Sequence, residues 1–216
     1  MANYLIIGGH GKVALLAAPL LVDEGHSVTS IIRNPDHTSD VENTGAKPLV
    51  LDIESATVDD LVEAMGGMDA VVWSAGAGGG NPARTRAVDY EAATRSIDAA
   101  KQAGVGRYVM VSHLGSRLDH GVPEDNSFHT YATAKAEADE YLRASGLDFT
   151  ILGPGSLTLE EPSGSITVHQ ADYDGPSETS RSNVARTIVA ALNNNGSICK
   201  TIRYSDGDTP IDTAID

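Results

Sequence analysis

The chain is short of cysteine, lysine and long apolar runs, and each shortage excludes a class of protein. Cys199 is the single cysteine among 216 residues, so no disulfide can form within the chain and a reducing setting is expected. The apolar runs are far shorter than the roughly 18–20 residues of a membrane-spanning helix. The N-terminus has no basic flank of the kind that begins a signal peptide. We therefore expect a cytoplasmic protein with no membrane partner.

Positive charge is scarce as well. The 15 Lys and Arg side chains face 30 Asp and Glu side chains, which gives a formal net charge of −15. Such a surface repels nucleic acid, so we expect no nucleic-acid partner. It also repels an anionic cofactor at long range. Any site for such a cofactor must therefore be locally basic or built from backbone N–H groups.

Three kinds of active site leave recognisable patterns, and the sequence has none of them. The seven histidines do not cluster with other ligands at metal-binding spacing, so we expect no metal site. There is no G-x-S-x-G elbow, which disfavours serine hydrolase chemistry. A P-loop lysine motif is missing too, which disfavours a P-loop nucleotide site.

What the chain does contain is an alternation of strand-like and helix-like segments. Strands are expected at 3–7, 27–32, 48–51, 70–73, 107–111 and 149–152, and helices at 15–23, 56–65, 82–103 and 127–145. This alternation predicts an α/β fold with a doubly wound, mostly parallel Rossmann-type sheet covered by helices on both faces. Because no linker interrupts it, residues 1–216 are expected to form a single domain.

The alternation loosens after Pro154. We expect a strand at 166–169, a helix at 182–192 capped by Ser180 or Ser182, a strand at 199–204 and a short helix at 210–215. Open α/β sheets bind ligands beyond the carboxyl ends of the strands, at the topological switch point. Residues 154–216 are therefore predicted to be a small C-terminal portion that covers the substrate crevice.

The first thirty-three residues follow the order strand, glycine turn, helix and strand. Gly8 permits the tight turn, Gly11 lets a pyrophosphate approach the backbone, and Ala14 is small where helix and strand pack. The N–H groups at the helix start would point at the phosphates. A glycine turn without a ligand is the alternative. The preferred interpretation is a dinucleotide cofactor, contacted at Gly8, His10, Gly11, Lys12 and Val13.

The residue at the end of the second strand bears on which dinucleotide binds. An acidic side chain there would bind the ribose 2′-hydroxyl of NAD, whereas an arginine accommodates the 2′-phosphate of NADP. Arg33 stands at this place, no acid occupies positions 32–34, and Lys12 could add a second cation. We therefore predict NADP, with NAD as the second choice. The alternative is that Arg33 is only a solvated loop side chain.

A second segment of small residues, 74–81, follows the strand at 70–73. Small side chains let a cofactor lie against the backbone. For residues 78–80, a free loop is an equally good interpretation.

Tyr131 and Lys135 are four residues apart on an expected helix, so they share a face. An ammonium near a phenol stabilises the phenolate and lowers its pKa, which suits acid–base chemistry during hydride transfer. Ser112 ends the strand at 107–111, where its hydroxyl could hold the same substrate oxygen. The alternative is a pair of surface neighbours. In this fold we predict Ser112, Tyr131 and Lys135 to be catalytic.

Taken together, these segments resemble the short-chain dehydrogenase/reductase superfamily, and within it the atypical NmrA-like branch. The similar segments include the turn at 8–14, Arg33, and residues 51–53, 111–112, 131–142, 147–152, 181–185 and 207–211. The resemblance implies a Rossmann fold that binds NAD(P). It also implies contacts of Asp52 and Ile53 with the adenine and of Ala75 and Gly76 along the cofactor.

At the nicotinamide end the resemblance implies Ser112, Tyr131 and Lys135, with Pro154 and Gly155 beside the carboxamide. The chain departs from the branch at two places. Gly153 stands where an arginine usually precedes the Pro–Gly pair, and His10 stands within the glycine turn. The first change removes a charge contact, and the second leaves backbone contacts intact.

We predict an NAD(P)H-dependent oxidoreductase that passes hydride to a small carbonyl, quinone or flavin-like acceptor. The second hypothesis is a non-catalytic redox sensor that binds NADP(H), in which the Ser112 and Tyr131 hydroxyls would point away from each other. A nucleotide-sugar epimerase or dehydratase ranks third, because few residues follow Pro154 to build a substrate lobe. The partner is expected to be a small-molecule substrate, and the chain a monomer or a homodimer.

Overall fold

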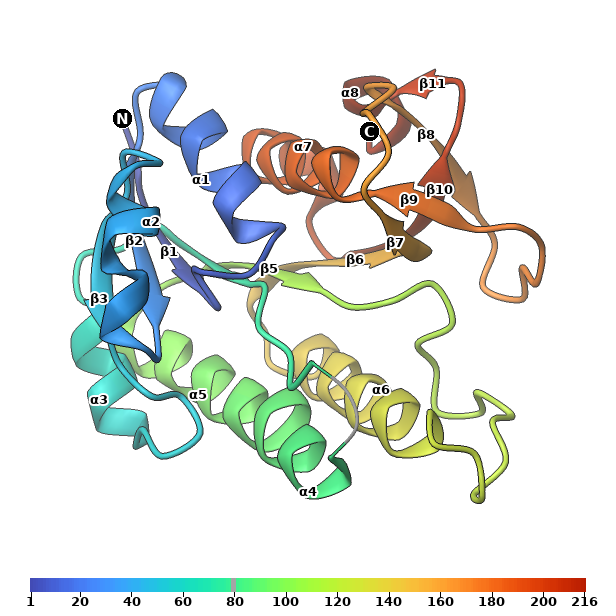
Figure 1. Ribbon diagram of the computed structural model, residues 1–216, viewed down its shortest axis with the longest axis horizontal. Helices are drawn as coiled ribbons and strands as arrows, with labels where there is room; N and C mark the ends of the chain where they lie inside the picture. Colours follow the sequence, from blue (N-terminus) through green and yellow to red (C-terminus); the bar gives the residue numbers. More distant parts are fainter. Residues whose placement is uncertain (79–80) are drawn as a thin grey trace.

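The predicted N-terminal βαβ unit is present in the computed structural model, which describes residues 1–78 and 81–216 (Figure 1). It consists of β1 (Asn3–Ile7), α1 (Ala14–Asp23) and β2 (Ser27–Ile32), with β1 and β2 paired in parallel. Alternate residues of β1 belong to two different hydrophobic clusters, Ile6 to one and Ile7 to the other. The sheet is therefore buried on both faces, as its continuous apolar strands require.

The main sheet has nine strands in the order β11-β8-β10-β6-β5-β4-β1-β2-β3. Besides β1 and β2, its parallel strands are β3 (Lys47–Val50), β4 (Ala70–Trp73), β5 (Arg107–Val111), β6 (Asp148–Pro154) and β10 (Lys200–Asp206). Two antiparallel strands, β8 (Ser165–His169) and β11 (Thr209–Pro210), complete one edge. The strand order turns back between β1 and β4, which is the switch point where such sheets bind ligands. The predicted α/β, mostly parallel Rossmann sheet is confirmed.

Helices cover both faces of this sheet (Figure 1). One face carries α1, α7 (Arg181–Asn193) and α8 (Ile211–Ala214), and the other carries α3 (Val58–Ala64), α5 (Ala93–Ala103) and α6 (His129–Arg143). The long helix expected at 82–103 is built from three consecutive pieces. They are α4 (Pro82–Thr85), a π-helical segment η2 (Arg86–Ala92) and α5. Single π-helical turns of this kind occur frequently at functional sites.

Local capping explains where several helices begin. Thr57 accepts a hydrogen bond from the Asp60 amide at 3.1 Å while the Asp60 carboxylate accepts from the Thr57 amide, which is a capping box. The Ser180 hydroxyl accepts from the Asn183 amide at 3.1 Å. Ser180, and not Ser182, is therefore the cap of α7.

Several short elements were not predicted. They are η1 (Pro35–His37), α2 (Thr38–Glu42), β7 (Ser156–Thr158), β9 (Glu178–Ser180) and η3 (Asn195–Ser197). Within residues 154–216, β8, β10 and β11 extend the sheet, and α7 packs against α1. Only residues 154–157, 173–175 and 177 of this portion line a cavity at the crevice. None of the helices in the described ranges is long and apolar enough to cross a membrane.

Candidate functional site

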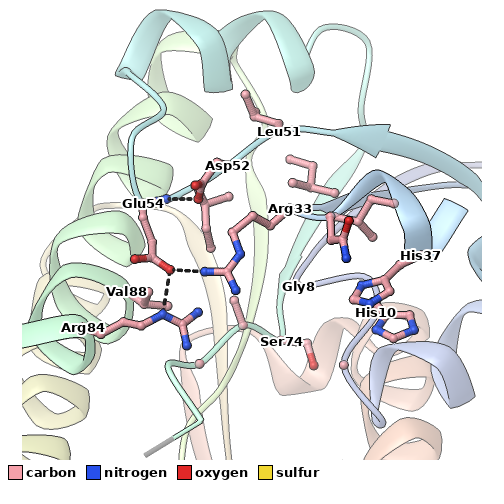
Figure 2. A pocket seen from close by; sticks show the side chains of 17 residues that line it. Gly8, His10, Arg33, His37, Leu51, Asp52, Glu54, Ser74, Arg84 and Val88 are labelled. Atoms are coloured by element: carbon pink, nitrogen blue, oxygen red, sulfur yellow. Dashed lines mark hydrogen bonds and ion pairs between the residues drawn. The ribbon is translucent and has the colours of Figure 1, made fainter. Parts of the chain in front are cut away.

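A cavity of about 340 Å³ lies beyond the carboxyl ends of β1, β2 and β4, and we call it the Arg33 cavity (Figure 2). The predicted contact residues that line it are Gly8, His10, Gly11, Arg33, Asp52, Ile53, Ala75 and Gly76. They come from the glycine turn and from the ends of three neighbouring strands. The fold therefore brings most of the predicted cofactor contacts into one hollow.

The glycine turn fits closely around its neighbours. Gly8 has φ +88°, and a Cβ there would lie 2.7 Å from the Ala75 Cα, so only glycine is accommodated. The Gly11 amide donates to the Gly8 carbonyl at 2.8 Å, which closes the turn. Ala14 is fully buried at the start of α1, as its predicted packing role requires. The turn therefore has the close backbone geometry of a phosphate cradle.

The start of α1 offers backbone donors to this cavity. The Gly11 amide is already used within the turn, so the donors must come from the residues that follow it. Across residues 1–78 and 81–216, no protein acceptor takes the amides of Lys12 and Val13. These two amides stand at the positive end of the helix dipole, so they can bind an anion without a basic side chain. The Lys12 side chain is exposed and does not line the cavity.

Two arginines of the Arg33 cavity share one carboxylate (Figure 2). Glu54 Oε1 lies 2.8 Å from Arg33 Nη1 and 2.8 Å from Arg84 Nε. Arg84 also donates from Nη1 to the Ala77 carbonyl at 2.7 Å. Asp52 and Glu54 line the same cavity as the two arginines, so the cavity is not locally basic, and both guanidinium groups are already paired. Sequence reasoning missed Glu54 and Arg84, whose positions only the folded chain brings together.

Two more cavities continue the crevice toward α6. One of about 650 Å³, the Thr130 cavity, is lined by Gly76, Gly78, Asn81, Pro82, Thr85, Ser127, Phe128, Thr130 and Tyr131. The other, of about 420 Å³, is the Ser112 cavity. Its lining includes the predicted residues Ser112, Tyr131, Pro154 and Gly155. Gly76 lines both the Arg33 and the Thr130 cavity, and Tyr131 lines both of the others, so the three hollows are linked by shared residues.

The Ser112 hydroxyl points inward to a buried acid. It donates to Asp139 Oδ2 at 2.6 Å, and the Ser116 hydroxyl donates to the same oxygen at 2.5 Å. Asp139 has no exposed surface, and its burial raises the pKa of the carboxyl above the usual range. Because Asp139 follows Lys135 by one helical turn, extending the Tyr131–Lys135 spacing would have found it.

Lys135 does not act on Tyr131 as the sequence predicted. The Lys135 ammonium is buried and donates to the Val111 carbonyl at 2.8 Å. Burial raises the pKa of Tyr131 well above its usual value, and the charges of Asp89 and Asp139 raise it further. The expected lowering of the Tyr131 pKa is therefore wrong for this structure, because burial disfavours the phenolate and two nearby acids add to that effect.

Asp89 is a second buried acid beside the crevice. It lies in the π-helical segment η2, is 1% exposed, and accepts from the Ala77 amide at 3.1 Å through Oδ2. Its Oδ1 lies 3.3 Å from where a Cβ on Gly76 would stand and has no partner in the described chain. Burial raises the pKa of Asp89, and the Lys135 charge opposes that rise. Asp89 lines none of the three cavities, so this unpaired oxygen lies buried behind Gly76, which lines two of them.

Three rings gather where the Thr130 and Ser112 cavities meet. Phe128 and Tyr131 have ring centroids 5.2 Å apart, and His113 lies 5.6 Å from Phe128 and 5.5 Å from Tyr131. Burial lowers the pKa of His113 to about 4, so its ring is neutral near pH 7. Phe128 is 44% exposed although the chain contains only two phenylalanines, so an apolar face is presented to the cavities.

The departure at Gly153 is matched on the neighbouring strand. Gly153 pairs with Arg203 in the β6–β10 register, and a Cβ at 153 would lie 3.3 Å from the Arg203 Cγ. Arg203 Nη2 donates to the Ser116 carbonyl at 3.3 Å. The glycine therefore leaves room for a guanidinium that comes from β10, close to the Ser112 and Asp139 pair.

The other predicted site residues are placed as follows. Val13 is buried beside the turn, and it lines none of the three cavities. Of residues 78–80, Gly78 lines the Thr130 cavity and the other two lie outside the described residues. No three His, Cys, Asp or Glu side chains of the described ranges gather in an arrangement that could hold a metal ion.

Comparison with known proteins agrees with this geometry. The sequence profile of a family described as NAD(P)H-binding matches residues 8–195. The UPF0659 protein C216.03 of Schizosaccharomyces pombe is 35% identical over 234 aligned residues, covering 100% of this chain and 94% of the relative.

Two solved structures superpose on nearly the whole chain. A candidate NAD-dependent epimerase/dehydratase from Bacillus halodurans is 31% identical with a TM-score of 0.91, covering 100% of this chain and 99% of its own. The oxidoreductase ylbE from Lactococcus lactis is 27% identical with a TM-score of 0.85, covering 99% and 94% respectively. The similarity therefore includes both ends of the crevice.

Proposed function

This chain belongs to the NAD(P)H-binding, NmrA-like family of Rossmann-fold proteins, and we propose that it is an NADPH-preferring oxidoreductase of the short-chain type. Its substrate would be a small carbonyl, quinone or flavin-like acceptor. The observation that carries the proposal is the linked crevice. The Arg33 cavity contains the glycine turn, and through Gly76 it continues to the cavities that Tyr131 lines.

The residues present fit a pyridine dinucleotide. The glycine cradle would hold the pyrophosphate on the amides of Lys12 and Val13. Asp52 and Ile53 line the Arg33 cavity where the adenine would lie. The unpaired Oδ1 of Asp89 would accept from a ribose hydroxyl near Gly76. When bound, NADPH supplies a hydride, and the chain supplies position and protons.

Tyr131 would supply the proton to the acceptor oxygen. The phenol keeps its proton at neutral pH, as a donor in the direction of reduction must, although its raised pKa makes it a weaker acid. Ser112 would orient the acceptor oxygen, since it lines the same cavity as Tyr131. Lys135 would hold a ribose hydroxyl once a ligand competes with the Val111 carbonyl for its ammonium.

The ring cluster supports a planar acceptor. Phe128, His113 and Tyr131 offer ring faces and edges at a cavity of several hundred Å³. Aromatic side chains pack well against flat conjugated ligands, in offset or edge-to-face contact. A quinone or flavin-like molecule matches this surface better than a sugar, which would need more polar partners.

Replacing the proton donor tests the proposal. Tyr131→Phe should lower turnover of a carbonyl, quinone and flavin panel by about 100-fold or more, because general acid catalysis contributes that much. Fluorescence titration with NADPH should give an unchanged dissociation constant, since the phenol does not hold the cofactor. Tyr141→Phe is the matched control, because Tyr141 lies on α6 but its hydroxyl donates to Asp98, away from the cavities. Full turnover in the Tyr131 variant would remove Tyr131 from the chemistry.

A second candidate function rests on the direction of the Ser112 hydroxyl. Ser112 donates its only proton to Asp139, so it does not offer that proton to a substrate. A protein that binds NADP(H) without turnover and signals to a partner needs no ordered donor in the cavity. Saturable NADPH binding with no turnover of any acceptor in the panel would favour this sensor.

A nucleotide-sugar epimerase or dehydratase is the third candidate. The name of the B. halodurans relative supports it, while the small portion after Pro154 provides little material for a sugar-nucleotide lobe. Incubation with nucleotide-sugars in the presence of NAD would separate it from a reductase, because an epimerase regenerates its cofactor within each turnover.

A further inference from the structure

The geometry points to Glu54 as the residue that limits how strongly this protein selects NADPH over NADH. Glu54 holds Arg33 and Arg84 in an ion-pair bridge across the Arg33 cavity, and the 2′-phosphate of NADPH must take Arg33 out of that bridge. The inference rests on the proposed function, because it assumes that a pyridine dinucleotide occupies the crevice. In this inference, Glu54 competes with the 2′-phosphate for Arg33 and so weakens the binding of NADPH.

The bridge spans elements that are far apart in the sequence. Arg33 follows β2, Glu54 follows β3, and Arg84 lies in α4 (Figure 2). One oxygen, Glu54 Oε1, takes both guanidinium groups at 2.8 Å. All three side chains line the Arg33 cavity. The Arg33 guanidinium therefore lies across the cavity toward Glu54, and it is not left free in solvent.

The backbone of Glu54 is fixed from two directions, and its side chain is the least exposed of the three in the bridge. Arg95 Nη2 donates to the carbonyls of Ile53 and Glu54, at 2.9 and 3.1 Å. The Glu54 amide donates to Asp52 Oδ1 at 3.0 Å. The Arg33 side chain, which is 55% exposed, is therefore freer to leave the bridge than that of Glu54, which is 26% exposed.

The charges explain why the bridge opposes a phosphate. Arg33 and Arg84 line the cavity together with two acids, Asp52 and Glu54, so the four formal charges cancel. A 2′-phosphate that bonds Arg33 would also come close to the Glu54 carboxylate, and like charges at that range repel. The gain from the arginine is therefore reduced by the loss of its existing ion pair. NADH carries only a hydroxyl at this place and meets neither effect.

The two dissociation constants of wild type and Glu54→Gln test the inference. Calorimetric titration of the full-length protein with NADPH and NADH should show NADPH tightening by about five- to tenfold in the variant, a typical contribution of a charge-assisted pair. NADH should change by less than about twofold, since it lacks the charged group. The pair 2′,5′-ADP and 5′-AMP should give the same contrast, because these fragments carry only the adenosine end.

Matched variants separate the bridge from general charge effects. Glu63→Gln removes the same charge from an exposed position on α3 and should leave both constants unchanged. Adding Arg33→Met to Glu54→Gln should abolish the tightening of NADPH, since the freed arginine is then absent. Glu54→Ala, checked by thermal unfolding, replaces Glu54→Gln if the latter does not fold.

The outcomes distinguish this inference from the proposed function. If wild type binds both cofactors and Glu54→Gln changes neither, the bridge is not the selectivity determinant, and the proposed function is unaffected. If the variant weakens NADH alone, Glu54 binds the ribose hydroxyl and the inference is overturned. If wild type binds neither cofactor, both the inference and the proposed function fail.

Discussion

The Arg33 cavity and the Ser112 cavity hold their charges in different ways. Glu54 and its two arginines keep 26–55% of their side-chain surface exposed, so water and salt screen their interaction. Beneath the Ser112 cavity, Asp139 and Lys135 are almost completely buried. Exposed pairs can exchange partners at small cost, whereas buried charges lose much free energy when a partner is removed. The exposed pairs around Glu54 can therefore be exchanged for contacts with a cofactor. The buried Asp139 and Lys135 are suited to keeping one protonation state.

The largest expected effect at the Arg33 cavity comes from a substitution in the glycine turn, where the backbone is closely packed. Gly8→Ala should lower the free energy of unfolding by about 3 kcal/mol, because it combines a positive φ with a close contact to the Ala75 backbone. Urea unfolding measures this change. Gly25→Ala is the control, since Gly25 has φ +85° and nothing within 4 Å of its Cβ position, so only about 1 kcal/mol is expected. Equal losses would show that the cradle is not tightly packed.

Replacing one acid at each cavity, Asp139 below the Ser112 cavity and Glu54 in the Arg33 cavity, tests whether the buried charges contribute more to stability than the exposed ones. Asp139→Asn should cost about 2–3 kcal/mol of unfolding free energy, because it leaves the buried Lys135 with less compensation and weakens the bonds of two serines. Glu54→Gln should cost less than about 1 kcal/mol, since its pairs are exposed. Urea unfolding of both variants under one buffer decides the matter. A larger loss at Glu54 would reverse the comparison.

The pH dependence of stability sharpens the picture of the buried end. The pKa of His113 falls to about 4 in the folded chain, so between pH 6.5 and 4 the unfolded chain binds the proton and the folded chain does not. The His113 contribution to stability is therefore full above pH 6.5 and declines by about 3 kcal/mol as the pH falls to 4.

Chemical unfolding of wild type and His113→Gln across this range measures that decline as the difference between the two curves. The raised pKa values of Asp89 and Asp139 act in the opposite direction, because those acids favour the folded chain as they protonate. Both proteins contain these acids, so their effect cancels in the difference. A difference that does not vary with pH would mean that His113 is not held neutral by the fold.

Much of the Arg33 cavity was predictable because its parts are local in the sequence. The glycine turn, Ala14 and Arg33 belong to one βαβ unit, whose geometry follows from hydrophobic periodicity and turn chemistry. The mostly parallel sheet followed from the alternation of strands and helices in the same way, but the order of its strands did not. Glu54 and Arg84 were not predictable, because the pairing of two loops depends on which strands are neighbours in the sheet.

The Ser112 end was predicted only as a set of residues. The sequence placed Tyr131 and Lys135 on one helix face, and that placement holds. The charged and polar groups around these two side chains could not be predicted from the helix alone, because Asp89 comes from η2 and Ser112 from the end of β5. Aromatic clustering of His113 with Phe128 also depends on the course of the long segment between β5 and α6.

The sequence by itself determined the alternation of strands and helices, the glycine turn and the positions of the candidate proton donor and cations. Those features depend on short-range backbone preferences and on which faces are apolar. Only the tertiary structure decided how the charges are paired, because Glu54 meets two arginines and Asp139 meets two serines through contacts between separate elements. Protonation depends on burial and neighbouring charge, and both arise only when distant segments come together.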